Sequence, residues 1–362
     1  MKRLASNNVE QFRKDLVHWF IEEQRQLPWR TTKDPYRIWV SEIMLQQTRV
    51  DTVIPYYERF MEWFPTLDEF AEADEEKVLK AWEGLGYYSR VRNLHSAVKD
   101  VKENYGGIVP NTPEEIKRLK GVGPYTAGAI LSIAYGVPEP AVDGNVMRVL
   151  SRILEIYDDI AKPATRKIFE QAVRELIDPH HTSEFNQAMM ELGALICVPG
   201  KPACLLCPVR EHCTAFAKGV QNELPVKTKT KKTKTVHLAA MVFTDATGKM
   251  VIRKRPQTGL LAGLWEFPSI ETTGTEKDLK KMLASEYDIH IHDIRHIGDI
   301  NHVFSHLIWE IKAYMVTVDG VEVIQNQTQK WAYVKDEDFQ HYAMPVSHQK
   351  IYEAFLFNQN RD

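Results

Sequence analysis

The spacing of apolar residues changes once along this 362-residue chain, just after Cys213. From about residue 9 to 217, apolar side chains recur every three or four residues, as on one face of an α-helix. From residue 236 onward, short apolar runs predict strands, with a helix at about 276–287. The sequence therefore predicts a multi-domain protein, an all-α core followed by an α+β domain. The helical stripes lie at 9–20, 38–49, 112–135, 143–155, 165–177 and 184–196, and the clearest strands at 238–243, 249–253 and 307–315.

Charge and hydropathy limit the classes of function. The chain has 46 Lys and Arg against 49 Asp and Glu, a formal net charge of −3, so any DNA-binding face has to be local. The segment 225–235 holds five lysines and no acid; it is either a solvated linker or a linker that also contacts phosphate. No run approaches the roughly 18 apolar residues of a membrane span. We expect a monomeric cytoplasmic protein without membrane contact.

All four cysteines lie between positions 197 and 213, in the order Cys197-x6-Cys204-x2-Cys207-x5-Cys213. A disulfide framework would distribute cysteines over the chain, whereas thiolates this close together are typical of a metal site. Zinc ribbons usually separate two Cys-x2-Cys knuckles, and here one pair stands between two single cysteines. The spacing favours a [4Fe–4S] cluster and leaves zinc as the alternative.

Two further motifs have the composition of a DNA-processing site. The Gly121-Val122-Gly123 turn, between two helical stripes, directs backbone N–H groups outward from a helix N-terminus, where they bind a phosphate. The alternative is a plain helix turn. Glu42 and Asp143 stand among apolar neighbours, which tend to raise a carboxyl pKa as a general acid requires. The alternatives are an exposed helix face for Glu42 and a helix N-cap for Asp143.

Several segments together resemble one enzyme family. They are Leu27-Pro28-Trp29-Arg30, Trp39-Val40-Ser41-Glu42-Ile43-Met44-Leu45-Gln46-Gln47-Thr48, Gly84-Leu85-Gly86-Tyr87-Tyr88-Ser89-Arg90 and Val142-Asp143-Gly144-Asn145-Val146. The helical half resembles the helix–hairpin–helix DNA glycosylases with a [4Fe–4S] loop, the endonuclease III superfamily. Within it, these segments are similar to the MutY-type adenine DNA glycosylases. The resemblance implies a [4Fe–4S] cofactor on the four cysteines and, as partner, double-stranded DNA with adenine opposite 8-oxoguanine or guanine.

The resemblance also implies a mechanism. Glu42 would protonate N7 of adenine, and an ionised Asp143 would stabilise the oxocarbenium sugar, directly or through a transient adduct. Tyr125 and Asn145 would support these two acids. Strand-cutting relatives carry a lysine where this chain has Tyr125, so the implied enzyme is monofunctional. A bacterial cytoplasm is the default location, and the DNA partner implies association with the nucleoid.

The resemblance places the DNA contacts as well. Trp29, Arg30 and Gln187 would hold the flipped adenine, and Gln47 and Tyr87 would wedge into the duplex. As alternatives, Trp29 and Tyr87 would be core aromatics. The full set of implied DNA contacts in the helical half is Arg25, Trp29, Arg30, Leu45, Gln47, Thr48, Leu85, Tyr87, Gly121, Gly123 and Gln187.

The C-terminal domain resembles Nudix hydrolases through the stretch 263–268, Gly-Leu-Trp-Glu-Phe-Pro. The acid-rich metal-binding helix of that family is absent at 278–286, so the resemblance implies a lesion reader in place of a second enzyme. Its reader loop would be Phe304-Ser305-His306, although a lone histidine is more often structural. The implied domains are a helical core at residues 1–220, a linker at 221–235 and a Nudix-like domain at 236–362. Within the helical core, the hairpin region would span about 28–135 and the cluster region would combine residues 1–27 with 136–220.

Three other functions compete with this interpretation. A pyrimidine-directed glycosylase of the same superfamily would keep the cysteines and the hairpin but lack the reader domain. A DNA-binding module with a redox cluster would not need the pair Glu42 and Asp143. A nucleotide pyrophosphatase in the C-terminal domain would hydrolyse 8-oxo-dGTP with Mg²⁺.

Overall fold

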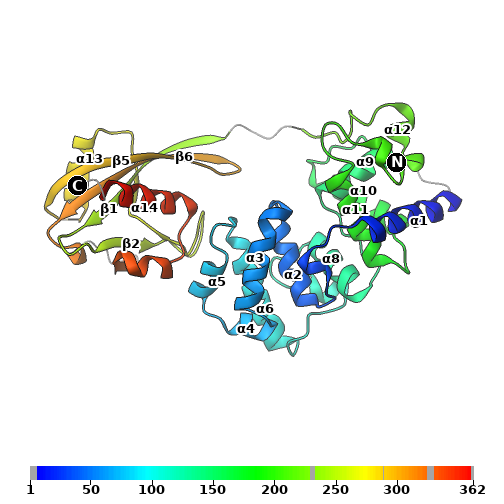
Figure 1. The fold of residues 1–362 in the computed structure, drawn as a ribbon, viewed down its shortest axis with the longest axis horizontal. Helices are drawn as coiled ribbons and strands as arrows, with labels where there is room; N and C mark the ends of the chain where they lie inside the picture. The colour runs from blue at the N-terminus through cyan, green and yellow to red at the C-terminus, as the bar shows by residue number, and fades with distance from the viewer. Residues whose placement is uncertain (1–5, 229–232, 288, 324–329, 360–362) are drawn as a thin grey trace. The chain divides into compact units, whose positions relative to one another are not determined.

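The computed structural model describes residues 6–228, 233–287, 289–323 and 330–359 (Figure 1). The chain divides into two compact units, Met1–Glu72 with Asn93–Thr230 and Ala73–Arg92 with Lys231–Asp362. The first unit is helical and the second carries a mixed β-sheet. The predicted all-α core and α+β domain are therefore confirmed. The predicted domain boundaries stay a prediction, and residues 229–232 of the linker lie outside the described residues.

The helices of the N-terminal half include every apolar stripe of the sequence and several segments outside the stripes. Their bounds are α1 (Ser6–Glu23), α2 (Pro35–Leu45), α3 (Val50–Trp63), α4 (Leu67–Glu72), α5 (Glu75–Ala81), α6 (Ser89–Asn104), α7 (Pro113–Ile116), α8 (Pro124–Tyr135), α9 (Gly144–Ile153), α10 (Arg166–Leu176), α11 (Thr182–Leu195) and α12 (Thr214–Lys218), with short 3-10 turns η1 (Pro28–Arg30), η2 (Pro163–Thr165), η3 (Cys204–Leu206) and η4 (Arg210–His212). Within the described residues, no helix is both long and apolar enough to cross a membrane.

The stripe at 38–49, which predicts a continuous helix, is interrupted after Leu45. Helix α2 ends at Leu45 because Gln46 takes an extended backbone (φ −60°, ψ 113°) and Gln47 a left-handed one (φ 58°). A non-glycine residue in the left-handed region cannot continue an α-helix. The apolar pattern runs across this break because α3 begins again at Val50 and buries its own face.

Helix α1 anchors the cluster region through its predicted stripe. Phe12, Leu16 and Phe20 are each at most 1 % exposed and pack in one core with α9, α10 and α11. Burying an apolar side chain of this size contributes about 1.5–3 kcal/mol. This core fixes α9 and α11, the two helices that carry Asn145 and Gln187.

Two glycines let three backbone segments approach closely. A Cβ on Gly128 of α8 would lie 1.9 Å from the carbonyl oxygen of Pro140, and one on Gly193 of α11 would lie 2.7 Å from Cβ of Asn145. Real Cβ atoms do not approach other atoms so closely, so glycine is required at both positions. The segment that leads into α9, with Asp143 at its end, is thereby held between α8 and α11.

The described strands of the second unit form one mixed sheet. Its strands are β1 (Lys234–Thr244), β2 (Met250–Lys254), β3 (Trp265–Glu266), β4 (Ser269–Glu271), β5 (Ile291–Val303), β6 (Leu307–Val318) and β7 (Trp331–Val334). The order is β3-β2-β1-β6-β5, with β4 paired to β1 and β7 to β2. The β1–β6 pair is parallel, from Lys234 beside Leu307 to Thr244 beside Thr317, and the other pairs are antiparallel.

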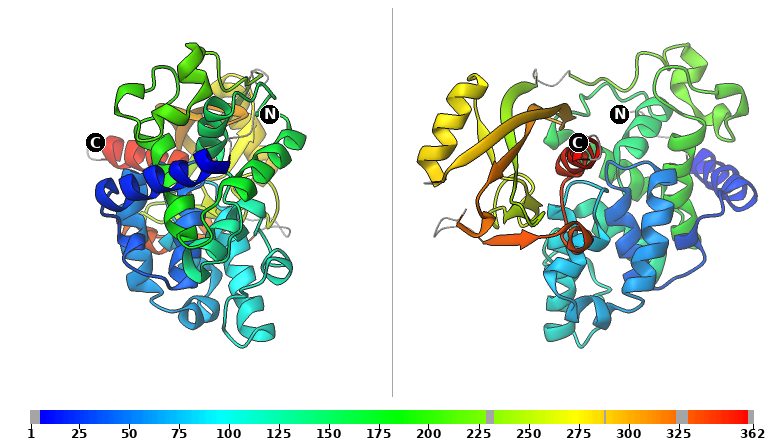
Figure 2. Two further views of the ribbon diagram at one scale, coloured as in Figure 1. Left: turned by 90° about the vertical axis from the view of Figure 1, so that its right-hand side faces the viewer. Right: turned by 60° about the vertical axis from the view of Figure 1, so that its left-hand side comes forward.

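Two helices cover the sheet (Figure 2). Helix α13 (Glu276–Tyr287), which matches the predicted helix, packs on one side of β1, where Met241 and Phe243 point. Helix α14 (Val346–Gln359) packs on the other side with Ala240 and Val242. The short 3-10 segments η5 (Val321–Val323) and η6 (Asp336–His341) complete the unit. Since successive residues of a strand point to opposite faces, β1 is buried on both sides and reads as a continuous apolar run.

Candidate active site

A cavity of about 160 Å³ lies in the helical unit, bounded by α2, α8, α11 and the loops before α2 and α9. Its lining joins side chains from segments far apart in the sequence. The residues singled out in the sequence that line it are Arg25, Trp29, Arg30, Glu42, Leu45, Thr48, Tyr125, Asp143, Asn145 and Gln187. The folding of α2, α8 and α11 against one another therefore creates one site, and three carboxyl groups, those of Glu42, Asp143 and Glu191, line it.

Glu42 lies within α2 and is only 5 % exposed, so its interpretation as part of an exposed helix face is wrong. The hydroxyl of Tyr125 donates a hydrogen bond of 2.5 Å to Oε2 of Glu42. Burial raises the pKa of Glu42 to about 7, against the hydrogen bond from Tyr125 and the charge of Arg30, while nearby Asp143 adds to the rise. Glu42 can therefore hold a proton near neutral pH and deliver it as a general acid.

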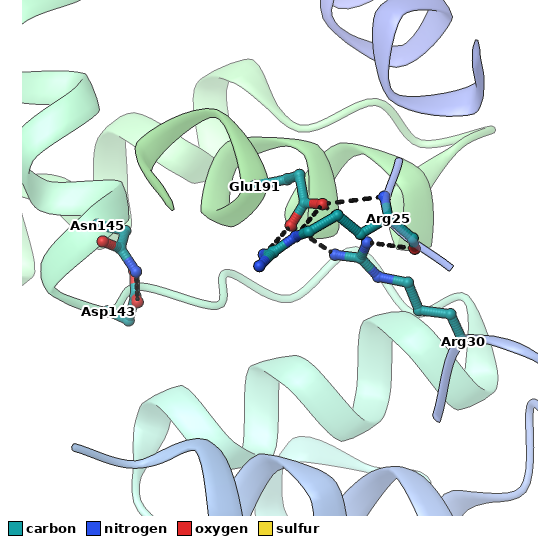
Figure 3. Close-up of polar contacts among 5 residues, drawn as sticks. All are labelled: Arg25, Arg30, Asp143, Asn145 and Glu191. Carbon is teal, nitrogen blue, oxygen red and sulfur yellow. Dashed lines mark hydrogen bonds and ion pairs between the residues drawn. The ribbon is translucent and has the colours of Figure 1, made fainter. Parts of the chain in front are cut away.

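Asp143 has a different environment. It is the N-cap of α9, as its alternative interpretation predicts, and its Oδ1 accepts a 2.8 Å hydrogen bond from the Val146 amide. The side-chain amide of Asn145 donates to Oδ2 over 2.8 Å (Figure 3). Burial raises the pKa of Asp143, and these hydrogen bonds to the ionised form oppose the rise. The helix N-terminus also favours a negative charge at this position.

The sequence did not single out Glu191, which also lines the cavity. Its carboxylate forms ion pairs with Arg25 (2.7 Å) and Arg30 (2.9 Å). Burial would raise the pKa of Glu191, but the hydrogen bonds from both arginines outweigh burial and lower it to about 2. One signal pointed to it: Glu191 follows Gln187 by four residues on α11, and residues four apart share a helix face.

Two arginines of α9 connect this site to the cysteine loop, and the sequence did not single them out either. Arg148 donates to the side-chain oxygen of Asn145 and to the carbonyl of Cys197, each over 2.8 Å. Arg152, which is 3 % exposed, donates to Sγ of Cys197 over 3.1 Å. Positively charged side chains thus lie between the acids and the cysteine sulfurs.

The four cysteines line one small cavity whose other walls are largely apolar. All four are free thiols. Burial raises the pKa of Cys204 and Cys213, and that of Cys207 to about 12. Since burial disfavours a free thiolate, the ionised sulfurs need a cationic partner, and a metal cluster supplies one. The donor set fits an iron–sulfur cluster, although no group of three or more His, Cys, Asp or Glu among the described residues converges on a single metal ion.

The hairpin glycines take the predicted place before α8. Gly121 has a left-handed backbone (φ 78°), and a Cβ there would lie 2.8 Å from Cβ of Asn93. Gly123 is the N-cap of α8, so the turn ends on a helix N-terminus. Gln47, the predicted wedge, is exposed and has a left-handed backbone as well. Strained non-glycine residues of this kind cluster at functional sites.

In the second unit Tyr87 also has a left-handed backbone (φ 48°) and is 46 % exposed, so its interpretation as a core aromatic is wrong. Leu85 is buried. The loop Phe304-Ser305-His306 joins β5 to β6, and the Phe304 ring packs on Trp309 with 4.9 Å between ring centres. A cavity of about 590 Å³ within this unit is lined by Tyr87 and by the three loop residues.

Comparison with known proteins identifies the family. Residues 40–175 match the HhH-GPD superfamily of base excision DNA repair proteins, and residues 239–354 match the NUDIX domain. A rat protein named adenine DNA glycosylase is 35 % identical, over 96 % of this chain and 78 % of its own length. The chain belongs to the adenine DNA glycosylases. A relative of the same name from Buchnera aphidicola (strain Bp) is 32 % identical over 87 % of this chain and 88 % of its own.

Solved structures resemble the helical half. A thermostable thymine-DNA glycosylase superposes with a TM-score of 0.53 at 27 % identity, covering 59 % of this chain and 98 % of its own. Endonuclease III in a non-covalent DNA complex gives a TM-score of 0.51 at 23 % identity, over 60 % of this chain and 100 % of its own, and supports the fold. The similarity to the adenine enzymes extends over nearly the whole chain, whereas that to the thymine enzyme covers 59 %.

Proposed function

We propose that this protein binds duplex DNA and hydrolyses the N-glycosidic bond of adenine placed opposite 8-oxoguanine or guanine, without cutting the strand. The observation that carries the proposal is the pair Glu42 and Asp143 in the wall of one 160 Å³ cavity. One carboxyl has a pKa near 7 and the other accepts two hydrogen bonds. Carboxyl groups held in different environments divide the acid and stabilising roles of glycoside hydrolysis.

The reaction begins when adenine leaves the helix, because the acids cannot reach it in the stack. Glu42 donates its proton to N7, the C1′–N9 bond breaks, and its electron pair goes to the departing base. Asp143 faces the oxocarbenium sugar as an anion, and water adds to C1′ while Glu42 recovers a proton. Trp29, Arg30 and Gln187 line the cavity and hold the base.

The absence of strand cleavage follows from Tyr125. A glycosylase that also cuts the strand needs an amine to form a Schiff base with the sugar. The Tyr125 hydroxyl donates to Glu42 and to the sulfur of Met190. A phenol cannot form a Schiff base, so this side chain tunes the acid and leaves the abasic strand intact.

The four cysteines hold a [4Fe–4S] cluster in this proposal. When bound, the cluster supplies the positive charge that keeps the buried sulfurs ionised and closes the 197–213 loop. The chain's own contribution is to direct Arg152 at Sγ of Cys197 and Arg148 at the neighbouring carbonyl.

The second unit reads the base opposite adenine. Phe304 lies on Trp309, and Ser305 and His306 are exposed at the rim of the same cavity. Substituting Ser305 and His306 by alanine is expected to reduce the preference for 8-oxoguanine over guanine while adenine is still released from both. An unchanged preference would remove this role.

The test is single-turnover base release from duplexes with adenine opposite 8-oxoguanine, guanine or thymine, scored with and without alkali. We expect alkali-dependent cleavage that is fastest opposite 8-oxoguanine. Asp143→Asn should bind the duplex but release no adenine. Asp34→Asn is the matched control, because Asp34 caps α2 by accepting from the Tyr36 amide outside the cavity. Release by Asp143→Asn at the wild-type rate, or excision of a pyrimidine in place of adenine, contradicts the proposal.

A further inference from the structure

Glu191 receives hydrogen bonds from two arginines of one loop (Figure 3). Its Oε1 accepts from the Arg25 amide (3.2 Å), Arg25 Nε (2.9 Å) and Arg30 Nη1 (3.0 Å). Its Oε2 accepts from Arg25 Nη2 (2.7 Å) and Arg30 Nη2 (2.9 Å). Both guanidinium groups therefore bind the same carboxylate through two nitrogens each, the geometry that fixes their planes most firmly.

The same contacts join the two ends of the segment 25–30, which leads into the cavity. Arg30 Nη1 also donates to the Arg25 carbonyl over 3.0 Å, and the Arg30 guanidinium lies 5.1 Å from the centre of the Phe20 ring. The side chain of Glu191 is 2 % exposed and that of Arg30 is 12 % exposed. Between these two arginines stands Trp29, whose ring packs on Tyr57 at 5.4 Å. Glu191 thus fixes both ends of the segment that supplies the cavity with Trp29.

Glu191 also affects the net positive charge that Arg30 places next to Glu42. Arg30 lowers the proton affinity of Glu42 through its positive charge. The ionised carboxylate of Glu191 lies against that guanidinium and offsets part of its charge. Because electrostatic effects are strong between buried groups, and Glu42 and Glu191 are both buried, the offset helps Glu42 keep its proton.

We propose that Glu191 is a positioning residue of the adenine pocket, which holds Arg25 and Arg30 in place against the flipped base and balances their charge next to Glu42. The inference rests on the proposed function of the cavity. Three of the five Arg30 N–H groups are engaged by Glu191 and the Arg25 carbonyl, which leaves Nε and one Nη2 hydrogen outside these bonds. The base is recognised by donors whose orientation is set before it arrives.

Glu191→Gln tests both proposed roles of Glu191, which are to hold the two arginines in place and to balance their charge next to Glu42. A glutamine has one acceptor oxygen, and its NH₂ group would face guanidinium N–H donors. We expect the single-turnover rate of adenine release to fall by roughly 10- to 100-fold, as for a displaced substrate-positioning group. The alkaline limb of the pH–rate profile should move to lower pH, since Arg30 becomes unbalanced. A purely structural role would leave that limb in place.

Two further variants separate geometry from charge. Glu191→Asp keeps the negative charge on a shorter side chain. The alkaline limb of its pH–rate profile should therefore stay at the wild-type pH, while the rate of adenine release falls in part. Glu139→Gln is the matched control, because Glu139 accepts two 2.9 Å hydrogen bonds from Arg174 and lies 3.8 Å from Lys117, away from the cavity lining. It should preserve both the rate and the limb.

An activity-independent measurement keeps the inference distinct from the proposed function. The Arg25 amide donates to Glu191, so its hydrogen exchange in the intact protein should be faster in Glu191→Gln, with thermal melting as the check on folding. If the wild-type protein releases no adenine, the proposed function fails. The exchange result alone then decides whether Glu191 holds Arg25 and Arg30 in place. The inference would be overturned if Glu191→Gln kept the wild-type rate of adenine release, the wild-type position of the alkaline limb and the wild-type exchange of the Arg25 amide.

Discussion

Replacing Tyr125 by phenylalanine should move the alkaline limb of the pH–rate profile of base release toward higher pH. The Tyr125 hydroxyl donates to Oε2 of Glu42 over 2.5 Å and lowers the pKa of that carboxyl. Removing the hydroxyl takes a donor from the ionised form while the burial remains. Glu42 then holds its proton to higher pH, and a reaction that needs the proton continues to higher pH.

The size of the shift follows from the hydrogen bond. A hydrogen bond to a charged group contributes about 1.5–3 kcal/mol. At about 1.4 kcal/mol per pKa unit this is roughly one to two units. Starting from a pKa of about 7 for Glu42, the alkaline limb should move by that amount toward higher pH. The measurement is the single-turnover rate of adenine release with enzyme in excess, at a series of pH values.

The matched control is Tyr135→Phe. Tyr135 lies on the same helix, and its hydroxyl donates to the Val109 carbonyl over 2.5 Å. This variant removes one phenolic hydroxyl without touching the acid, so its limb should coincide with that of wild type. A Tyr125→Phe limb that stays in place or moves to lower pH would refute the assignment of Glu42 as the acid that Tyr125 tunes.

Three other outcomes are expected. Gly128→Ala should destabilise the helical unit by about 1–3 kcal/mol and slow base release, because its Cβ would meet the Pro140 carbonyl oxygen at 1.9 Å; unchanged thermal melting would contradict the close packing. Cys204→Ser should lose the brown cluster absorbance and bind DNA more weakly, whereas full binding by cluster-free protein would refute the role of the loop. The full chain with Mg²⁺ should not hydrolyse 8-oxo-dGTP, because the acid-rich helix is absent at 278–286 and no group of three or more His, Cys, Asp or Glu among the described residues could hold the metal ion; release of pyrophosphate would contradict this.

The sequence predicted the fold class, and it marked two of the acids that line the cavity, because both inferences depend on patterns that it displays directly. Apolar periodicity placed α1, α9, α10 and α11, and the alternation at 307–315 placed β6. Glu42 and Asp143 are separated by about a hundred positions, and their apolar neighbours alone marked both as buried acids. The resemblance to a family then joined them in one site.

The sequence did not predict features that depend on tertiary partners. The end of α2 at Leu45 is set by the left-handed backbone of Gln47, which apolar periodicity does not register. Glu191 belongs to a mostly apolar helix, and its partners Arg25 and Arg30 precede it by more than 150 positions. No local pattern connects a carboxylate to two arginines so far away. The packing of α1 against α11, which brings the segment after α1 to Glu191, is itself the result of folding.

Three carboxylates in one cavity wall therefore have three different electrostatic environments. Burial disfavours the ionised form of each, and partners decide how far it prevails. Glu42 receives one phenolic hydrogen bond and its pKa rises to about 7; Asp143 receives an amide and a carboxamide at a helix N-terminus; Glu191 receives two guanidinium groups and its pKa falls to about 2. In the proposed mechanism the same kind of group thus supplies an acid, a stabilising anion and a fixed counter-charge. Because Glu42, Asp143 and Glu191 are carried by α2, by the start of α9 and by α11, moving any one of these helices relative to the partners of its acid would alter the chemistry of the site before it altered the fold.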